Sequence, residues 1–423
     1  MISDADRDLL TRMFDAAVAA ADPKQAMADV LPDKPRGRTV VIGAGKGAAQ
    51  MAAAFEELWD GPVDGVIVTR YGYAAPCKSL KVMEAAHPVP DDAGLQAAQA
   101  LLAAVDGLTE DDLVVALVCG GGSALLPAPP GDLTLKDEAA LNEVLLASGA
   151  PISAMNAIRK QVSGIKGGRL AAAAYPAKVV SLIVSDVPGD DPAQVASGPT
   201  VPCAQDRASA MRLVKSHGIT LPPRVAAFLD AADEDAPKPD DPIFARNEVH
   251  VIASAARSLE AAGVVAEAEG VTAAILSDAI EGESREVGKL IAALSREVRL
   301  RDRPFTRPVV LLSGGETTVT LGGAKGGRGG RNTEFLLSWL LEVDGIDGLA
   351  ALAADTDGID GSEDNAGAFA TGNTAARMRA VGFAPDEALA AHDAWGAFDA
   401  VGELFVPGPT GTNVNDFRAI LIR

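Results

Sequence analysis

The chain is poor in side chains that would point to several well-known classes of protein. Its 423 residues include only 3 cysteines, 4 histidines and, among the aromatics, 3 Trp, 3 Tyr and 11 Phe. Cys77, Cys119 and Cys203 are odd in number and widely spaced, which argues against a disulfide framework or a zinc site and fits a reducing compartment. No histidine lies in a recognisable triad context, which disfavours Ser-His-Asp hydrolysis. The few aromatics leave little for stacking on nucleic-acid bases.

Positive charge is also scarce, because the formal net charge is -21. This balance disfavours nucleic acid and anionic membranes as partners, since phosphate backbones and acidic headgroups attract clustered Lys and Arg. A protein this acidic that binds an anionic substrate must concentrate its cations in a few loops. The N-terminus lacks the basic start and apolar core of a signal peptide, and one uncharged stretch, 113–131, is interrupted by glycines and prolines. We therefore expect a cytoplasmic protein with no membrane partner.

The length predicts two α/β domains with a ligand-binding cleft between them, because 423 residues exceed one ordinary hydrophobic core. Residues 230–242 are rich in acids and prolines and predict an extended connector. The expected domains are therefore 1–235, with a Rossmann-like and mainly parallel sheet, and 243–423, a second α/β unit.

Short β-branched runs alternate with Ala-rich helical patterns in the first half, which predicts βαβ units. The expected strands are 39–42, 63–69, 80–86, 113–118 and 178–184. The expected helices are 48–58, 93–105 and 135–147, with Asp92 and Thr134 as N-caps of the last two. In the second half we expect strands at 249–253, 272–276, 309–313, 317–321, 349–354 and 403–406.

The first candidate loop follows the first expected strand and contains Gly43, Gly45, Lys46 and Gly47. A strand, glycines and then a helix present backbone N–H groups to an anion, and a lysine there adds a mobile positive charge. The loop matches G-x-G-x-x-A, although glycines also serve simple tight turns. A dinucleotide site would need an acid at the end of the second strand, where Arg70 follows Thr69.

Two further segments of the first half can approach an anion. After the strand 113–118, Gly120, Gly121, Gly122 and Ser123 can form a concavity lined by N–H groups. A basic segment, 155–169, follows and includes Lys160 and Lys166. It either binds a phosphate or small carboxylate or is a solvated helix face.

A cluster of carboxylates follows the strand 178–184. Asp186 and Asp190 are placed to hold Mg²⁺ through oxygen ligands at the carboxyl edge of a sheet. Asp, Gly and Pro are equally suited to forming turns, so this segment is either a magnesium site or a simple turn, and both interpretations stay open.

The second half repeats the pattern of strand ends rich in glycine and polar residues. Gly314 and Glu316 close one strand, and a loop of glycines, lysine and arginines, 322–334, leads through Arg331 into a helix. Such a loop is costly to order unless a ligand orders it. Asp357 and Asn413 lie on later polar edges suited to substrate hydroxyls. No Walker or protein-kinase motif is present.

These segments together resemble the glycerate 2-kinase family whose second domain is known as the MOFRL domain. The resemblance covers nearly the whole chain through ordered motifs that include VIGAGKGA at 41–48, CGGGSALL at 119–126, AIRKQVSGIKGGRLA at 157–171, SDVPGDDPAQVASGPTVP at 185–202, SGGETTVT at 313–320, GGRNTEF at 329–335, DTDGIDG at 355–361 and TNVNDFR at 412–418. Gln161 stands where the family more often has His, which argues against an acid–base role at that position.

The resemblance implies a kinase that uses ATP and Mg²⁺ to convert D-glycerate to 2-phosphoglycerate. It implies phosphate or substrate contacts for Lys46 and Arg331. Phosphoryl transfer also needs a group that orients the attacking hydroxyl, which could be Asp186, Asp190 or Asp357, and of these we select Asp190. Asp186 is the expected metal ligand, and Lys160, Lys166, Asp357 and Asn413 are the expected substrate contacts. The glycine loops with Ser123, Gly314 and Glu316 are expected to bind the nucleotide.

Two alternatives remain open at this point, and a homodimer is compatible with the sequence. A hydroxypyruvate reductase would use the first loop for a nicotinamide cofactor, NADH or NADPH, but would leave the second glycine-arginine loop without a role. A non-catalytic sugar-acid sensor would bind ligand without turnover.

Overall fold

The computed structural model describes residues 2–231, 235–321 and 326–423, and the chain forms two compact units. The central unit comprises Pro23–Ile252, and the terminal unit comprises Met1–Asp22 together with Ala253–Arg423. The sequence led us to place the division between 235 and 243. In the structure the division instead follows Ile252, and the N-terminal helix belongs with the C-terminal part of the chain.

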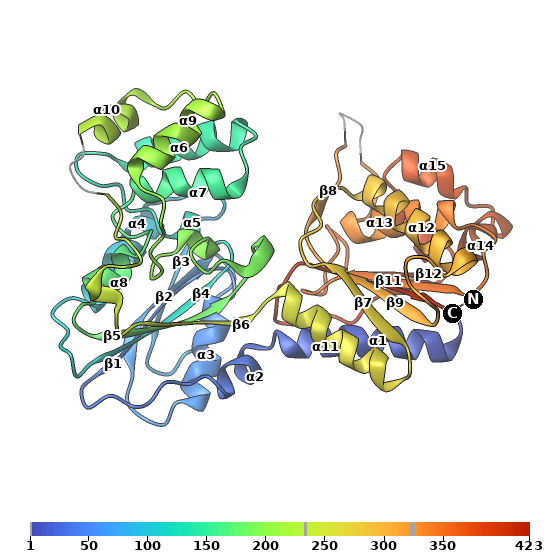
Figure 1. Ribbon diagram of the computed structural model, residues 1–423, viewed down its shortest axis with the longest axis horizontal. Coiled ribbons are helices and arrows are strands. Elements are labelled where there is room, and N and C mark those ends of the chain that lie inside the picture. Colours follow the sequence, from blue (N-terminus) through green and yellow to red (C-terminus); the bar gives the residue numbers. More distant parts are fainter. Residues whose placement is uncertain (1, 232–234, 322–325) are drawn as a thin grey trace. The chain divides into compact units, whose positions relative to one another are not determined.

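The central unit is built on a six-stranded sheet with the order β3-β2-β1-β4-β5-β6 (Figure 1). Its strands are β1 (Thr39–Ala44), β2 (Asp64–Arg70), β3 (Lys81–Ala85), β4 (Leu113–Cys119), β5 (Lys178–Val184) and β6 (Glu248–Ala253). The first five pair in parallel, with Val41 opposite Val115 and Gly65. Every residue of β4 is buried, because a central parallel strand is covered on both faces and so is apolar throughout.

Helices of the central unit cover both faces of the sheet and form a separate helical layer. They are α2 (Pro23–Ala28), α3 (Ala48–Leu58), α4 (Asp92–Ala104), α5 (Gly122–Leu125), α6 (Leu135–Ala147), α7 (Ile152–Gln161), α8 (Arg169–Ala173), α9 (Arg207–Ser216) and α10 (Pro223–Ala231), with short 3-10 turns at Pro188–Asp190, Val195–Ser197 and Pro242–Phe244. Leu101 of α4 packs in the core with Val40 and Ile42 of β1. Leu141, Ile158 and Val214 join α6, α7 and α9 in a second cluster.

The terminal unit contains a mixed six-stranded sheet with the order β13-β12-β11-β14-β9-β7. Its strands are β7 (Thr272–Ser277), β9 (Val309–Ser313), β11 (Leu349–Asp355), β12 (Gly367–Thr371), β13 (Leu404–Phe405) and β14 (Asp416–Ile422), and β8 (Gly282–Glu283) pairs separately with β10 (Thr317–Thr318). β14 is antiparallel to both β11 and β9. The amino end of β14 therefore lies at the same edge as the carboxyl ends of those two strands.

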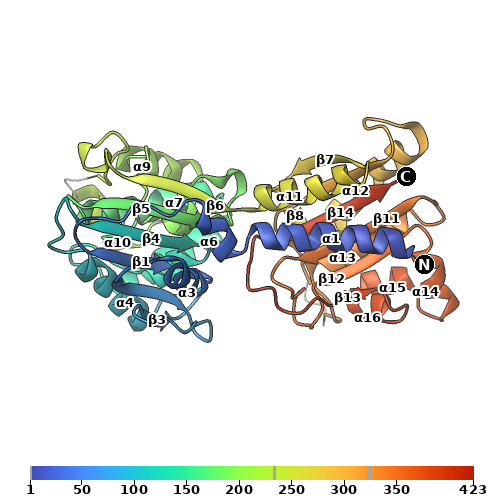
Figure 2. The same ribbon diagram turned by 90° about the horizontal axis from the view of Figure 1, so that it is seen from below.

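The helices of the terminal unit include the first helix of the chain. They are α1 (Asp4–Ala20), α11 (Ala255–Ala268), α12 (Ser284–Arg301), α13 (Arg331–Glu342), α14 (Thr374–Ala380), α15 (Pro385–Ala390) and α16 (Ala394–Asp399). α1 lies beside α11 (Figure 1, Figure 2), and Ser258 of α11 donates a hydrogen bond to the carbonyl of Ala17. Phe14 meets the rings of Phe405 and Phe417 edge-on at 5.0 and 5.8 Å. This apolar face explains why α1 packs in the terminal unit and not in the central unit, which follows it in the sequence.

Most expected elements are confirmed, and the differences have local causes. The strands 178–184 and 309–313 and the helices 48–58 and 135–147 have the expected bounds. Thr134 caps α6 in a capping box with Asp137, but the N-cap of α4 is Asp91, which accepts from the Gly94 N–H, and not Asp92. Two strands, β12 and β14, were not predicted from the sequence.

Candidate functional site

The central sheet has one point where the chain order reverses. From β1 the chain proceeds outward through β2 and β3 on one side, while β4 and β5 lie on the other side. Open α/β sheets bind ligands outside the carboxyl ends of the strands at such a switch point. The loops that follow β1 and β4, which carry Lys46 and Ser123, both begin there.

The first two predicted glycine loops are in direct contact. The Lys46 N–H donates to the Gly120 carbonyl at 2.8 Å, and the Gly47 N–H donates to the Cys119 sulfur at 3.1 Å. Gly45 has φ +140°, and a Cβ there would lie 2.3 Å from that sulfur, so only glycine fits this approach. Burial raises the pKa of Cys119 to about 12, so Cys119 is a neutral thiol that packs the two loops together.

The side chain of Lys46 crosses the bare backbone of Gly121. Gly121 has φ +78°, and a Cβ there would lie 2.8 Å from Lys46 Cγ and 3.1 Å from His87 Nε2. Burial, reinforced by the charges of Lys46 and Arg70, lowers the pKa of His87 from 6.5 to about 4. A neutral imidazole thus lies beside Lys46, and the sequence analysis had assigned His87 no role.

Uncompensated positive charge gathers at this edge. Neither the ammonium of Lys46 nor the guanidinium of Arg70 forms an ion pair with a residue that the structure describes. Among the described residues, no side chain caps the N-terminus of α3 at Gly47. The Asp186 carboxylate lies so close to Gly120 that a Cβ there would be 1.9 Å from Oδ2. The edge therefore offers cations, backbone donors and one carboxylate to a ligand.

Ser123 belongs to a hydrogen-bonded network with a strained segment. Its hydroxyl lies 2.7 Å from the Ser197 hydroxyl, which in turn donates to Asn156 Oδ1 at 3.1 Å. Ser197 has φ 61° and Asp190 has φ 53°, values that non-glycine residues rarely adopt. Such strain persists where surrounding structure enforces it and is common at functional sites.

The two lysines predicted to contact substrate are both buried. Lys166 pairs with Glu138 at 2.7 Å and donates to the Leu126 carbonyl, an arrangement that favours a structural role. Lys160 is 0% exposed, and its Nζ has no hydrogen-bond partner among the described residues. Burial lowers the pKa of Lys160. Both lysines stay predicted substrate contacts, and Lys160 is the one whose Nζ has no hydrogen-bond acceptor among the described residues.

A second polar site occupies the shared edge of β9, β11 and β14 in the terminal unit. Arg331, the first residue of α13, donates to Asp416 at 2.6 Å, to Asp355 at 2.7 Å and to Glu316 at 2.8 Å. Burial alone would lower the pKa of Arg331, but these three carboxylates raise it. Burial, opposed by Arg331 and reinforced by Asp357 and Asp416, raises the pKa of Asp355 well above its usual range.

Buried hydrogen bonds position this second site. Asp360 accepts from the backbone N–H groups of Asn332 and Thr333 and so holds the start of α13 in place. The fully buried Arg418 pairs with Asp416 and donates to the Gly314 carbonyl at 3.3 Å. The Arg331 guanidinium is therefore held from several sides.

The other predicted residues of the terminal unit lie on the neighbouring loops. Asn413 Nδ2 donates to Asp357 Oδ2 at 3.4 Å, and the Asp357 N–H donates to Asp355. Asp357 and Asn413 are thus brought together next to the Arg331 cluster. Of the predicted loop 322–334, residues 322–325 lie outside the described part of the chain.

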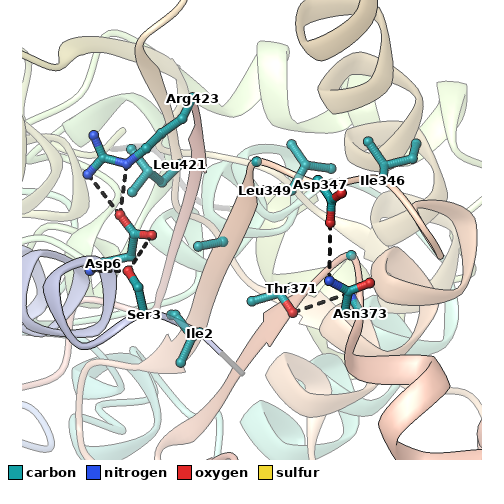
Figure 3. A pocket seen from close by; sticks show the side chains of 13 residues that line it. Ile2, Ser3, Asp6, Ile346, Asp347, Leu349, Thr371, Asn373, Leu421 and Arg423 are labelled. Atoms are coloured by element: carbon teal, nitrogen blue, oxygen red, sulfur yellow. Dashed lines mark hydrogen bonds and ion pairs between the residues drawn. The ribbon is translucent and has the colours of Figure 1, made fainter.

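A cavity of about 180 Å³ lies at the opposite edge of the same sheet (Figure 3). Thr371 and Leu421 line it near the carboxyl ends of β12 and β14, and Asp6 within it pairs with Arg423. Asn373 donates to Asp347 at 3.2 Å. None of the predicted site residues lines this cavity.

Within residues 2–231, 235–321 and 326–423, no three His, Cys, Asp or Glu side chains are grouped to hold a metal ion. Over the same ranges, no helix is both long and apolar enough to span a bilayer.

Comparison with known proteins identifies the family. Residues 9–230 match a family described as a domain of unknown function, DUF4147, and residues 309–416 match the MOFRL family. The D-glycerate 2-kinase of Thermotoga maritima is 37% identical over 418 residues, which cover 98% of each chain. The chain belongs to the glycerate 2-kinase family. The resemblance noted from its motifs is therefore confirmed.

Other members of the glycerate 2-kinase family agree on the fold but differ in their names. A crystal structure of a glycerate kinase from Thermotoga maritima matches with a TM-score of 0.89 and 36% identity over all of both chains. An Agrobacterium vitis protein named putative hydroxypyruvate reductase is 52% identical over 417 residues, 98% of this chain and 94% of that one. The predicted α/β architecture is confirmed, and the chain is an enzyme of the glycerate kinase family.

Proposed function

We propose that this enzyme transfers the γ-phosphoryl group of ATP to D-glycerate and releases ADP and 2-phosphoglycerate. The observation that supports the proposal best is the Lys46 ammonium, which forms no ion pair with the described residues and lies at the switch point between two glycine loops. Relatives named glycerate 2-kinase add independent support.

In this proposal the central unit binds and aligns the phosphate chain. The N-terminus of α3 and the Gly120–Gly122 backbone donate to phosphate oxygens, and Lys46 neutralises charge on the transferring group. The glycerate hydroxyl oxygen forms a bond to the γ-phosphorus as the bond to the β–γ bridging oxygen breaks. Asp190 accepts the hydroxyl proton, and ADP leaves.

The residues present fit a magnesium ion held largely by the substrate. Mg²⁺ usually retains waters and binds through one or two carboxylates together with phosphate oxygens. Asp186, packed against Gly120, supplies one such carboxylate beside the proposed phosphate site. When bound, the ion would neutralise charge on the phosphate oxygens.

The family resemblance leads us to propose Arg331, in the terminal unit, as a contact to substrate or phosphate. Glu316 is the most exposed of its partners, with 59% of its side chain accessible, against 8% for Asp355 and 0% for Asp416. An anion can therefore displace Glu316 from Nη1 while the other two carboxylates keep the guanidinium oriented. Asp357 and Asn413 would then hydrogen-bond to the hydroxyls of glycerate.

One alternative keeps specific support. The G-x-G-x-x-A loop at the end of β1 and the 52% identical relative named putative hydroxypyruvate reductase both favour a nicotinamide-dependent enzyme. Against it, β2 ends in Arg70, without the acid that would bind the ribose hydroxyls of NADH.

Parallel assays on the purified chain separate the two candidates. We expect ATP, Mg²⁺ and D-glycerate to give a phosphate ester that phosphorus NMR identifies as 2-phosphoglycerate, and EDTA to abolish its formation. Hydroxypyruvate with NADH or NADPH should cause no loss of reduced-cofactor absorbance. The opposite pair of results would establish the reductase.

A Lys46→Ala variant tests the proposed role of the ammonium. Losing a preorganised charge at the transferring group should lower kcat by roughly 100-fold or more. Lys81→Ala is the matched control, because Lys81 is exposed at the amino end of β3 and should leave kcat unchanged. Normal turnover by Lys46→Ala would remove Lys46 from the catalytic residues.

A further inference from the structure

The loop that follows β2 holds an arginine in a fixed orientation. Arg70 is the last residue of β2, and its guanidinium carbon lies 3.5 Å from the centre of the Tyr73 ring. The Tyr73 N–H donates to the Arg70 carbonyl at 3.1 Å, and Gln50 Nε2 donates to the Tyr73 carbonyl at 3.3 Å. A stacked guanidinium keeps its N–H groups directed outward from its edge, where they can meet a planar or tetrahedral anion.

The guanidinium donors of Arg70 have no side-chain acceptor among the described residues. Arg70 forms no ion pair with the described residues, and its Nε is buried without an acceptor. Buried donors in folded proteins are nearly always satisfied, so an unpaired N–H calls for a water, an ion or a ligand. Arg38 provides the contrast, because it pairs with Asp64 at 2.7 Å at the amino end of the same strand.

Arg70 belongs to the same edge as Lys46. Thr69, its neighbour on β2, donates through its hydroxyl to the Lys46 carbonyl at 3.0 Å, so the end of β2 is joined directly to the first glycine loop. His87, at the end of β3, interacts electrostatically with both cations. Lys46 follows β1 and Arg70 ends the neighbouring β2, so two cations without an ion pair among the described residues lie at this edge of a chain whose net charge is -21.

We propose that Arg70 is a phosphate-binding residue that donates to a second phosphate group of the ligand held by the Lys46 loop. The inference rests on the proposed function only in requiring a phosphorylated ligand at this edge. Two sources share that chemistry: the triphosphate chain of ATP and the 2′-phosphate of NADPH. A purely structural arginine, stacked on Tyr73 and hydrated, is the competing explanation.

Calorimetric titration of the full chain tests the assignment without requiring turnover. The ligands are inorganic tripolyphosphate, ATP, NADPH and NADH, and the variants are Arg70→Gln, Arg70→Lys and Tyr73→Ala. We expect Arg70→Gln to weaken binding of the phosphate-bearing ligand by about 10- to 100-fold, the usual effect of losing charge-assisted hydrogen bonds. Arg70→Lys should lose less because it keeps the charge, and Tyr73→Ala should fall between wild type and Arg70→Gln because it loses only the orientation.

Arg38→Gln is the matched control, since it removes the same charge from the other end of the sheet and should bind within about twofold of wild type. Thermal unfolding of each variant checks that it is folded, and Arg70→Lys keeps the test valid if Arg70→Gln does not fold.

The pattern across ligands identifies the source of the phosphate. Equal losses for tripolyphosphate and ATP assign Arg70 to the triphosphate chain, whereas a loss for NADPH alone assigns it to the 2′-phosphate. Either pattern supports the inference, and the second would also count against the kinase. Arg70→Gln binding all four ligands as wild type does would overturn the role of Arg70 and leave the kinase standing. A wild-type chain that binds none of them would overturn both.

Discussion

His87 is a histidine that stays neutral at physiological pH because of its surroundings. It is half-buried beside Gly121 and next to two cations, so its protonated form is disfavoured in the folded chain. In the unfolded chain the same ring has its ordinary pKa near 6.5. Between about pH 4 and 6.5 the unfolded state therefore binds more protons, and stability rises with pH through this window.

His87→Asn should remove this contribution to the pH dependence. Relative to wild type, the variant should gain stability as the pH falls from 7.5 to 4.5, by about 2–4 °C in Tm once solvent screening of the half-buried ring is allowed for. Carboxylates titrate in the same range, so the measurement is the difference between the two Tm curves. Parallel curves would show that His87 titrates normally in the folded chain.

The sequence predicts individual site residues where chemistry and local pattern coincide, as for Lys46 inside a glycine turn and Arg331 at the start of a helix. Their roles in the reaction stay predictions. The pairing of Lys166 with Glu138 could not be predicted, because a lysine buried against a carboxylate and a lysine that binds substrate have the same sequence signature. In the sequence, Arg70 stands out only because it occupies the position where a dinucleotide site would have an acid. No local sequence pattern indicates that its Nε is buried without an acceptor among the described residues.

Secondary elements were predictable where one physical pattern dominates. The uninterrupted apolar run of β4 predicts a strand buried on both faces, and the Ala-rich periodicity of α3 predicts its bounds. β14 was missed because Asp416 and Arg418 look like surface residues, whereas in the fold they are buried and paired with each other. β12 is short and rich in Ala and Gly, so its propensity is weak.

The position of α1 in the terminal unit could not be predicted from local sequence, because its partners lie far along the chain. We expect Phe14→Ala to destabilise the terminal unit by about 3–5 kcal/mol, the usual cost of an emptied aromatic site in a core. A Trp59→Phe background leaves Trp339 and Trp395, both in the terminal unit, as fluorescent probes during urea unfolding.

Asp8→Ala, on the exposed face of α1, is the control for this measurement and should change stability by less than about 1 kcal/mol. If Phe14→Ala left the tryptophan transition unmoved, α1 would contribute little to the terminal unit.

The whole chain divides into two units that each present a basic residue at a sheet edge. The strand order of the central unit brings the two glycine loops together, and the antiparallel β14 brings Asp416 to Arg331. Neither arrangement is visible from local patterns, since strand order is a property of the complete fold. The candidate loops could therefore be predicted from the sequence, but not which segments of the chain lie next to them in the fold.

Whether both basic residues act on one transferring group is a question of kinetic coupling. We expect Lys46→Ala and Arg331→Ala each to lower kcat by roughly 100-fold. If they stabilise the same transition state together, the double variant should be much less impaired than the product of the two effects. Arg301→Ala is the control, because Arg301 lies at the end of α12, is exposed and pairs with Glu297. Combined with Lys46→Ala, it should add nothing. Fully multiplicative losses for Lys46 and Arg331 would show that the two residues serve separate steps.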